Sequence, residues 1–401
     1  MRARGRLTLA RAIGLSLALT LASFGGPATA TPARSAARLS ALVPPSEDVP
    51  PSTGAPPSTG APAISIAPES SSAPTIAQLI GQKLVVRMDG LTPSADLLGR
   101  IERGEVGGVI LFGFNISTAT ALTALTATLR AAAATGGQPP LLIAVDQEGG
   151  SVKRIPWAPP TLSPRQMGDL ASTSVARSQG ALTGVALHDL GIDVDFAPVT
   201  DVPAGTSSFM YRAGRTWSFN ASRTAWLSNA FAEGLRMRGV LPTLKHFPGI
   251  GFATRNTDSS VVTIGASRSA LAPGLLPYRL AIGNHLPLIM LSNATYPAWD
   301  AVHAAGWSPA IAGTLLRAQL GFTGATITDS LDGTANARGI SVRRLAAAAA
   351  RAGTDLILTT GSETATKAVY AYLVAEANAG TISRTTLLAS YARIQTLKAG
   401  L

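Results

Sequence analysis

The sequence predicts one closed (β/α)8 barrel of the TIM type over residues 75–401, an α/β fold in which eight parallel strands alternate with helices. Short apolar runs recur eight times, and each is followed by a helical pattern. Several runs are continuously apolar rather than alternating, as expected for strands that helices cover on both faces. The roughly 325 residues in this part are long for an ordinary domain but normal for such a barrel.

The predicted strands are short and rich in branched apolar residues. In chain order they are residues 83–88 (KLVVRM), 107–112 (GGVILF), 140–145 (PLLIAV), 193–199 (DVDFAPV), 240–247 (VLPTLKHF), 286–292 (LPLIMLS), 324–329 (GATITD) and 354–360 (TDLILTT). A doubly wound open sheet is the alternative arrangement of such units. The first strand, however, is not followed by the glycine-rich phosphate fingerprint of that fold. Eight alternations favour the closed barrel.

Capping residues mark where several of the intervening helices begin and end. Each predicted helix starts at a Ser or Asn, and three stop at a glycine. The predicted pairs of limits are Ser117 to about residue 134, Asn220 to Gly239, Ser308-Pro309 to Gly321, and Ser341 to Gly353. These helices separate the second strand from the third, the fourth from the fifth, the sixth from the seventh, and the seventh from the eighth.

Residues 1–30 are predicted to be an export signal. They carry a basic start, an apolar run at residues 13–22 and an A-x-A-type cleavage site that ends at Ala30. The apolar run is shorter than the ~20 residues that cross a bilayer. We therefore expect a secreted protein, free or associated with the cell wall, whose mature chain has no integral membrane segment. The absence of cysteine excludes a lipid anchor at the cleavage site, disulfides and thiolate metal sites.

Residues 31–74 are predicted to be a disordered linker. This stretch is rich in Pro, Ser and Ala, contains the repeat PPSTGAPPSTGAP at residues 50–62, and has few large apolar residues. Such a composition buries too little surface to offset chain entropy. The linker is either a spacer that holds the barrel away from a wall or membrane, or a tail without a function of its own.

The charge balance gives little information about partners. The chain has 33 Lys and Arg against 22 Asp and Glu residues. This surplus would favour anionic wall polymers, but arginines scattered over helices explain it equally well. No basic cluster is interleaved with aromatic residues, so we do not expect a nucleic-acid partner. No metal-ligand cluster is visible either, and we expect a monomer without metal or organic cofactor.

Polar residues gather at the carboxyl ends of five predicted strands. They are Asp146-Gln147-Glu148 after the third strand, Thr200-Asp201 after the fourth, Lys245-His246 in the fifth, Ser292-Asn293 after the sixth and Asp329 after the seventh. The active sites of barrels of this type lie at that end. Random surface charge would not collect there, and the pattern therefore predicts an enzyme rather than a structural barrel.

Three of these groups suit the chemistry of sugars. Asp329 ends a β-branched strand, which is the rigid platform that a carboxylate nucleophile needs; the alternative is an aspartate that caps a helix. Asp146 and Arg154 flank a Gly-Gly turn and could bind hydroxyl groups, or they could form an internal ion pair. Lys245 and His246 place two donors directly before a Pro-Gly turn.

Six segments together resemble glycoside hydrolase family 3, and in particular its single-domain bacterial β-N-acetylglucosaminidase branch. VDQEGGSVKR, GIDVDFAPVTDV, RTWSF, KHFPGIG, LRAQLGFTG and ITDSL occur in the order seen in that family. The resemblance covers nearly all of residues 76–401. It implies a TIM-type barrel that cleaves N-acetylglucosamine-containing or other β-glycosides, such as those of cell walls, through a covalent glycosyl-enzyme.

The resemblance also implies roles for individual residues. Asp329 matches the nucleophile, and Asp146 matches the aspartate that holds sugar hydroxyls. The other substrate-binding positions match Arg154, Arg215, Lys245, His246 and Met290.

The sequence departs from the branch in the loop that follows Lys245-His246. The branch has K-H-F-P-G-H-G and then Asp-Ser-His, whose Asp and His form the acid/base dyad. Here Ile250 replaces the first of these histidines, and residues 256–260 read NTDSS without a dyad histidine. We expect Asp258 to act as acid/base alone. Two alternatives remain: another chain supplies the missing group, or the protein is a non-catalytic carbohydrate-binding pseudoenzyme.

Overall fold

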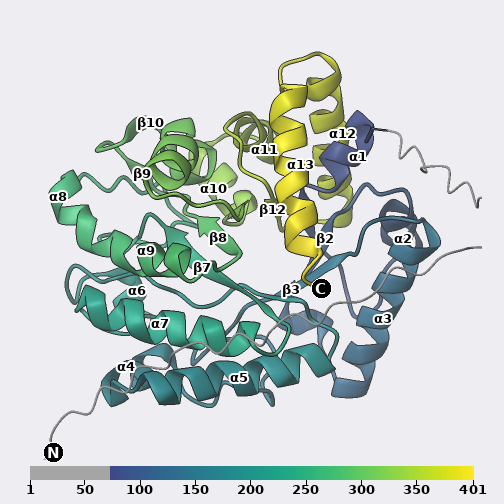
Figure 1. Cartoon of the computed structure of the whole chain (residues 1–401). Coiled ribbons are helices and arrows are strands. Elements are labelled where there is room, and N and C mark those ends of the chain that lie inside the picture. The colour runs from purple at the N-terminus through teal and green to yellow at the C-terminus, as the bar shows by residue number, and fades with distance from the viewer. Residues whose placement is uncertain (1–72) are drawn as a thin grey trace, which may run out of the picture. The chain divides into compact units, whose positions relative to one another are not determined.

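The computed structural model describes residues 73–401, which form the expected barrel (Figure 1). Eight parallel strands make one sheet in the spatial order β11-β8-β7-β6-β3-β2-β1-β12. The two ends of this order also meet, because Ile327 of β11 forms a parallel bridge with Leu356 directly before β12. There the Leu356 amide donates to the carbonyl oxygen of Thr326 at 2.8 Å. The sheet is therefore closed, and the predicted barrel is confirmed over the open alternative.

Each predicted strand is present within its predicted range. The strands are β1 (Leu84–Arg87), β2 (Gly108–Leu111), β3 (Leu142–Val145), β6 (Val194–Asp195), β7 (Leu241–Phe247), β8 (Leu288–Leu291), β11 (Ala325–Thr328) and β12 (Ile357–Thr359). The fourth strand is much shorter than predicted. Beyond Asp195 the contact with β7 is irregular: the Thr243 amide donates to the carbonyl oxygen of Ala197 at 2.9 Å, Pro198 has no N–H to donate, and Val199 forms only an isolated bridge with Lys245.

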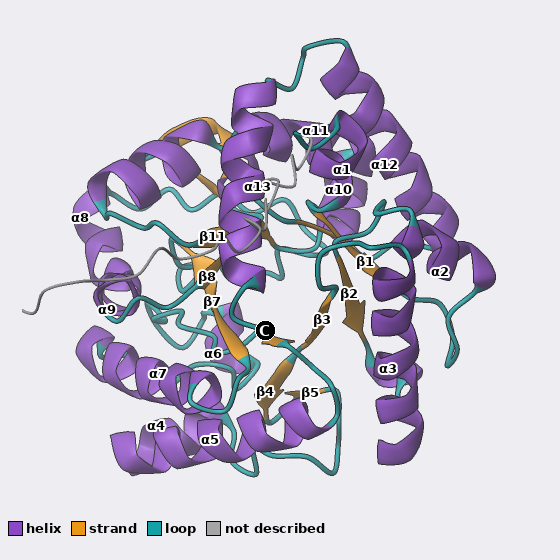
Figure 2. Ribbon diagram, turned by 45° about the vertical axis from the view of Figure 1, so that its right-hand side comes forward, coloured by secondary structure: helices purple, strands orange, loops and turns teal. Residues whose placement is uncertain are grey.

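Helices surround the strands on the outside (Figure 2). They are α1 (Ile76–Gly81), α2 (Ala95–Glu102), α3 (Ala119–Thr135), α4 (Pro164–Leu170), α5 (Thr173–Asp189), α6 (Phe209–Arg212), α7 (Ala221–Arg236), α8 (Arg268–Leu271), α9 (Leu276–Gly283), the π-helix η4 (Ala310–Gln319), α10 (Leu331–Arg338), α11 (Val342–Arg351), α12 (Glu363–Asn378) and α13 (Arg384–Lys398). None of these helices meets the length and apolarity that a membrane span requires.

The predicted helix limits agree with the structure to within a few residues. Asn220 caps α7 by accepting a hydrogen bond from the Arg223 amide at 2.9 Å. The cap of α3 is Thr118 and not Ser117. The predicted export signal and nearly all of the predicted linker lie outside the described residues.

The interior of the barrel is filled by apolar side chains. Alternate residues of the strands form one buried cluster, which consists of Val85, Ile110, Leu142, Ala144, Val194, Phe196, Leu241, Leu288, Met290, Ala325, Ile327, Leu356 and Leu358 together with two residues of α13, Ile394 and Leu397. The last helix therefore packs against the interior cluster, and the barrel is a filled core rather than a pore. A ligand can enter only beyond the packed layers, at a strand end.

Candidate active site

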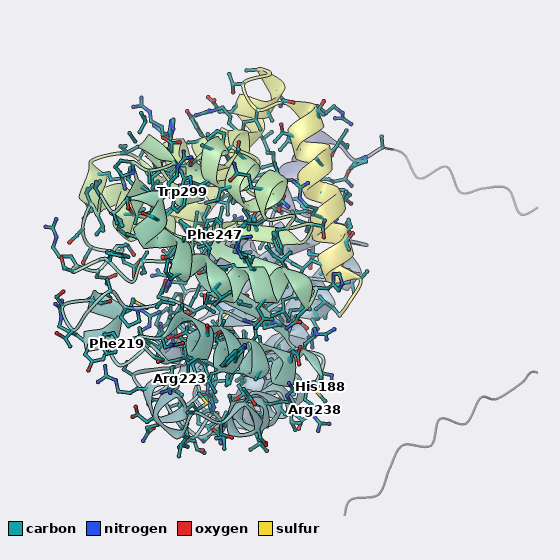
Figure 3. All side chains as sticks on the ribbon, turned by 60° about the vertical axis from the view of Figure 1, so that its left-hand side comes forward. His188, Phe219, Arg223, Arg238, Phe247 and Trp299 are labelled. Atoms are coloured by element: carbon teal, nitrogen blue, oxygen red, sulfur yellow. The ribbon has the colours of Figure 1, made fainter. Side chains whose placement is uncertain are left out.

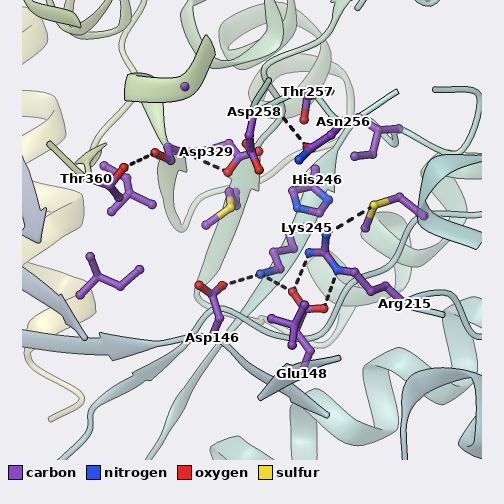
Figure 4. A pocket seen from close by; sticks show the side chains of 18 of the residues that line it. Asp146, Glu148, Arg215, Lys245, His246, Asn256, Thr257, Asp258, Asp329 and Thr360 are labelled. Atoms are coloured by element: carbon purple, nitrogen blue, oxygen red, sulfur yellow. Dashed lines mark hydrogen bonds and ion pairs between the residues drawn. The ribbon is translucent and has the colours of Figure 1, made fainter. Parts of the chain in front are cut away.

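A cavity of about 350 Å³ lies at the carboxyl ends of the barrel strands (Figure 4). It is lined by all eight residues predicted for the site: Asp146, Arg154, Arg215, Lys245, His246, Asp258, Met290 and Asp329. These residues come from five different strand ends and the segments that follow them. The closed sheet brings these strand ends to one rim, as in other barrels of this type.

A network of ion pairs forms one side of the cavity. Lys245 Nζ lies 2.7 Å from Asp146 Oδ1 and 2.7 Å from Glu148 Oε1. Arg215 donates two hydrogen bonds to Glu148, from Nε to Oε2 at 2.8 Å and from a terminal nitrogen to Oε1 at 2.7 Å. Such a bidentate pair sets both side chains in one orientation. The network holds the Lys245 ammonium and the Asp146 carboxylate at the cavity surface.

The network keeps its members charged despite their burial. Burial alone would raise the pKa of Glu148, but the positive charges of Arg215 and Lys245 hold this pKa at about 2. Burial would likewise lower the pKa of Lys245, whereas the carboxylates of Asp146 and Glu148 raise it above its usual value. Both groups are therefore ionised at neutral pH and can bind polar groups, but neither is suited to proton transfer.

Arg154 faces the cavity with unused hydrogen-bonding capacity. Its nearest carboxylate oxygen, Asp146 Oδ2, is 3.5 Å away, which is an ion pair without hydrogen-bond geometry. The guanidinium lies over the Phe112 ring at 5.5 Å from its centroid, and its buried Nε has no hydrogen-bond partner within the described residues. Arg154 can therefore donate to a ligand in the cavity.

His246 is oriented by a buried carboxylate. Its Nδ1 lies 2.8 Å from Asp201 Oδ2, and Asp201 Oδ1 accepts the Ile250 amide at 2.8 Å. The pairing of β7 with β8 shifts its register between Leu244 and Phe247. In a regular strand Lys245 and His246 would point to opposite faces, and a bulge removes this alternation. Both side chains therefore reach the same cavity.

Asp329 stands directly after β11 and is held by its backbone. Its amide donates to the carbonyl oxygen of Leu291 at 2.9 Å, which extends the pairing of β11 with β8. Its Oδ1 accepts the Ser330 amide at 2.8 Å. The Ser330 hydroxyl lies 2.6 Å from that of Thr360 at the end of β12. The carboxylate is thus attached to the rigid part of the barrel and borders the cavity.

Asp258 reaches the same cavity from the loop that follows β7. The residue as a whole is exposed, and its carboxyl group points into the cavity near Asp329 (Figure 4). Burial of the carboxyl group, with the negative charge of Asp329 as the second cause, raises the pKa of Asp258 to about 6; His246 and Arg215 oppose the shift. A proton is therefore retained at weakly acidic pH without a histidine partner.

The other three histidines do not replace the missing dyad histidine. His188 is at the end of α5, with its side chain 66% exposed, and lies on the surface near Arg238 (Figure 3). His285 lies three residues before β8, at the opposite end of that strand from the cavity. His303 belongs to the short strand β10 (Asp300–Ala304) and pairs with Asp300. None of the three lines the cavity.

Sequence reasoning assigned no role to several residues that complete the site. Glu148 and Thr360 line the cavity, and Asp201 orients His246. Glu148 and Asp201 were visible as acidic residues at strand ends, and Thr360 as the last residue of the eighth predicted strand. Their partners could not be inferred, because each contacts residues distant in sequence. Among the described residues, no group of three or more His, Cys, Asp or Glu side chains is arranged to hold a metal ion.

Comparison with known proteins gives a family match over almost the whole barrel. Residues 75–397 match the family described as "Glycosyl hydrolase family 3 N terminal domain". An "Uncharacterized secreted glycosyl hydrolase" of Arthroderma benhamiae is 36% identical over 334 residues, which cover 81% of this chain and 94% of that protein. A "Beta-hexosaminidase" of Alkalilimnicola ehrlichii is 33% identical over 299 residues, or 72% of this chain and 84% of the relative.

Solved structures give the same result. The family 3 β-N-acetylglucosaminidase of Paenibacillus sp. str. FPU-7 is similar with a TM-score of 0.79 and 30% identity, over 82% of this chain and 63% of that structure. The β-N-acetylhexosaminidase of Beutenbergia cavernae has a TM-score of 0.76 and 30% identity, over 82% of this chain and 99% of that structure.

Proposed function

This chain belongs to glycosyl hydrolase family 3, and from that premise we propose that it hydrolyses β-linked N-acetylglucosamine units with retention of configuration. It is a glycoside hydrolase whose relatives include proteins named as β-hexosaminidases and β-N-acetylglucosaminidases. The observation that carries the proposal is the cavity itself. It combines a strand-end carboxylate, Asp329, with a second carboxyl group of raised pKa, Asp258, opposite a set of charged donors and acceptors.

In the first step Asp329 is the nucleophile and Asp258 the acid. The ionised Asp329 attacks the anomeric carbon, and an ester bond forms as the glycosidic C–O bond breaks. The electron pair of that bond goes to the leaving oxygen, which takes the proton of Asp258. A pKa of about 6 lets Asp258 hold this proton in weakly acidic solution.

In the second step water hydrolyses the glycosyl-enzyme, and Asp258 acts as the base. Once Asp329 is esterified, its negative charge is gone, and one of the causes that raise the pKa of Asp258 disappears with it. Asp258 is then a carboxylate able to take a proton from water, which attacks the anomeric carbon and releases Asp329. The coupling between the two carboxyl groups therefore suits both steps.

The charged side of the cavity serves to hold the sugar. Asp146 offers carboxylate oxygens to hydroxyl groups, while Arg154, Lys245 and His246 offer donors or a ring nitrogen. Arg215 acts through Glu148, which it orients by two hydrogen bonds. Met290 contributes an apolar surface at the bottom of the cavity. Binding a sugar by several oriented groups positions its anomeric carbon for attack.

The location of the enzyme is a further part of the proposal. The basic and apolar pattern of residues 1–30 supports export, and residues 31–74 have the composition of a spacer before the barrel. A relative with "secreted" in its name is consistent with this. Glycans outside the cell that contain N-acetylglucosamine, such as those of walls, are accordingly the proposed substrates.

Replacement of Asp329 by Asn tests the catalytic assignment. The amide keeps the shape of the side chain but is not a nucleophile, so hydrolysis of a fluorogenic N-acetylglucosaminide should fall to background while binding of N-acetylglucosamine persists. A fluorinated substrate that slows hydrolysis of the intermediate should add its sugar mass to the peptide that contains Asp329 in the wild type, and not in the variant.

Asp96→Asn provides a matched control, because Asp96 is a half-exposed aspartate of α2 that does not line the cavity. This control should retain wild-type kcat/KM. Full activity of Asp329→Asn would remove Asp329 from the nucleophile's role. Background turnover in the wild type itself, together with measurable sugar binding, would instead identify a carbohydrate-binding protein without catalysis.

A further inference from the structure

We propose that Gly333 is a positioning residue, which seats the loop of residues 252–260 so that Asp258 reaches the cavity. The inference rests on the proposed acid/base role of Asp258. Gly333 lies on α10, in the first turn after Asp329 and Ser330, and the loop follows β7 on a neighbouring part of the rim. The two segments that bring the two carboxyl groups to the cavity therefore meet at this glycine.

The contact at Gly333 is closer than any side chain allows. A Cβ atom placed on Gly333 would lie 2.1 Å from the carbonyl oxygen of Asp258 and 3.0 Å from its carbonyl carbon. The neighbour is backbone, which cannot rotate away as the end of a flexible side chain would. Any residue other than glycine thus forces the loop and α10 apart at Asp258 itself.

Position 333 requires glycine because a side chain has no space there, and not because of its backbone conformation. Gly333 is not among the glycines with positive φ. Within a helix, glycine is about 1 kcal/mol less favourable than alanine, so local helix stability would select against it. The feature that requires glycine here is the close approach of the Asp258 carbonyl group.

The loop is anchored at both ends, where Arg212 also donates to the carbonyl oxygen of Thr254 at 2.8 Å, and the hydrogen bonds of residues 256–260 within the described part of the chain are local. Before Asp258, the carbonyl oxygen of Ala253 accepts the Phe209 amide at 2.7 Å. After it, the carbonyl oxygen of Val262 accepts the Thr295 amide at 3.0 Å. Asn256 Oδ1 accepts the Asp258 amide at 3.0 Å within the loop itself. The surface at Gly333 is therefore the support against which this middle part rests.

A methyl group at position 333 would move the acid without altering the nucleophile. To relieve the overlap, the Asp258 carbonyl group must withdraw by about 1 Å, and a misplacement of about 1 Å can cost about 100-fold in rate. Asp329 is held by β8 and β11 and stays in place. The variant Gly333→Ala should therefore slow the reaction by weakening protonation of the leaving group.

The experiment compares two N-acetylglucosaminides, one with an activated phenol as leaving group and one with an alcohol that needs protonation. Values of kcat/KM report the glycosylation step for both. For Gly333→Ala we expect a loss of about 10–100-fold with the alcohol and less than about threefold with the phenol. In an Asp258→Asn background, Gly333→Ala should cause no further loss with the alcohol, because the group that it displaces is already absent.

Gly313→Ala is the matched control, since Gly313 lies within η4 and its added Cβ would meet nothing within 4 Å. It should leave both substrates unaffected, and thermal unfolding should show that Gly333→Ala is folded. An equal decrease of kcat/KM for both substrates would overturn the positioning role of Gly333 but not the acid role of Asp258. A full additional decrease in the Asp258→Asn background would have the same meaning. If Asp258→Asn is itself insensitive to the leaving group, the acid assignment fails, and the role of Gly333 fails with it.

Discussion

At the scale of single residues, the pKa values of two carboxyl groups in one cavity are shifted in opposite directions. Burial together with the charge of Asp329 raises the pKa of Asp258 to about 6. Burial acts on Glu148 in the same direction, but Arg215 and Lys245 hold its pKa at about 2. When neighbours separate pKa values in this way, the groups take different roles. Glu148 is suited to permanent charge, and Asp258 to proton transfer.

The pH dependence of hydrolysis should show this difference. Asp258 must be protonated to donate, so kcat/KM for a substrate with an alcohol leaving group should decline as pH rises through about 6. An activated phenol needs little protonation, and its kcat/KM should lack this decline. Profiles of kcat/KM against pH for both substrates measure the effect. The same decline with both leaving groups would assign the titration to a group other than the acid.

At the scale of elements, the site depends on where strands end and on how the barrel is filled below them. Asp329 directly follows β11, the register shift in β7 interrupts the alternation at Lys245 and His246, and α13 packs against the interior cluster. The helix contributes no residue to the cavity, but it covers apolar side chains that would otherwise meet water. Its role is thus to stabilise the barrel that carries the rim.

Ile394 of α13 provides a test of this role. The side chain is fully buried in the interior cluster, so Ile394→Ala should lower the free energy of unfolding by about 2–5 kcal/mol. Leu388→Ala on the same helix removes a side chain that is 39% exposed and should cost less than about 1 kcal/mol. Denaturant unfolding of the two variants measures the difference. Equal costs would show that α13 is not packed as described.

At the scale of the whole molecule, one barrel carries every described residue that lines the cavity. The lining residues run from Ile110 to Thr360, and the closing strand pair and the interior cluster also lie within residues 73–401. We therefore expect the barrel to be an autonomous folding and catalytic unit.

A chain that starts at residue 73 should test this autonomy. Its kcat/KM for a small fluorogenic N-acetylglucosaminide and its unfolding midpoint should equal those of the chain that starts after residue 30, because both contain every described residue of the interior cluster and of the cavity. Circular dichroism melting and steady-state kinetics provide the measurements. A lower midpoint or a loss of activity in the shorter chain would show that residues 31–72 belong to the folded unit.

The strands and the rim of the barrel could be predicted because each produces a pattern of apolar or polar residues that are close together in the sequence. The apolar runs located all eight strands, and the polar strand ends located the rim. The fourth strand was predicted too long, since its regular ladder ends at Asp195 although the strand-like run continues to Val199. Long-range pairs such as Glu148 with Arg215 were not predicted, because residues far apart in sequence leave no periodic signal.

The sequence by itself determined the barrel, the order of its strands and the residues at their ends, because hydrophobic periodicity and capping are local properties. It also showed that the dyad histidine is missing. Only the tertiary structure decided that Asp258 lies beside Asp329 and that Gly333 leaves room for it. The pKa of a carboxyl group depends on burial and on charges brought near it by folding, and the closeness of two backbones depends on packing.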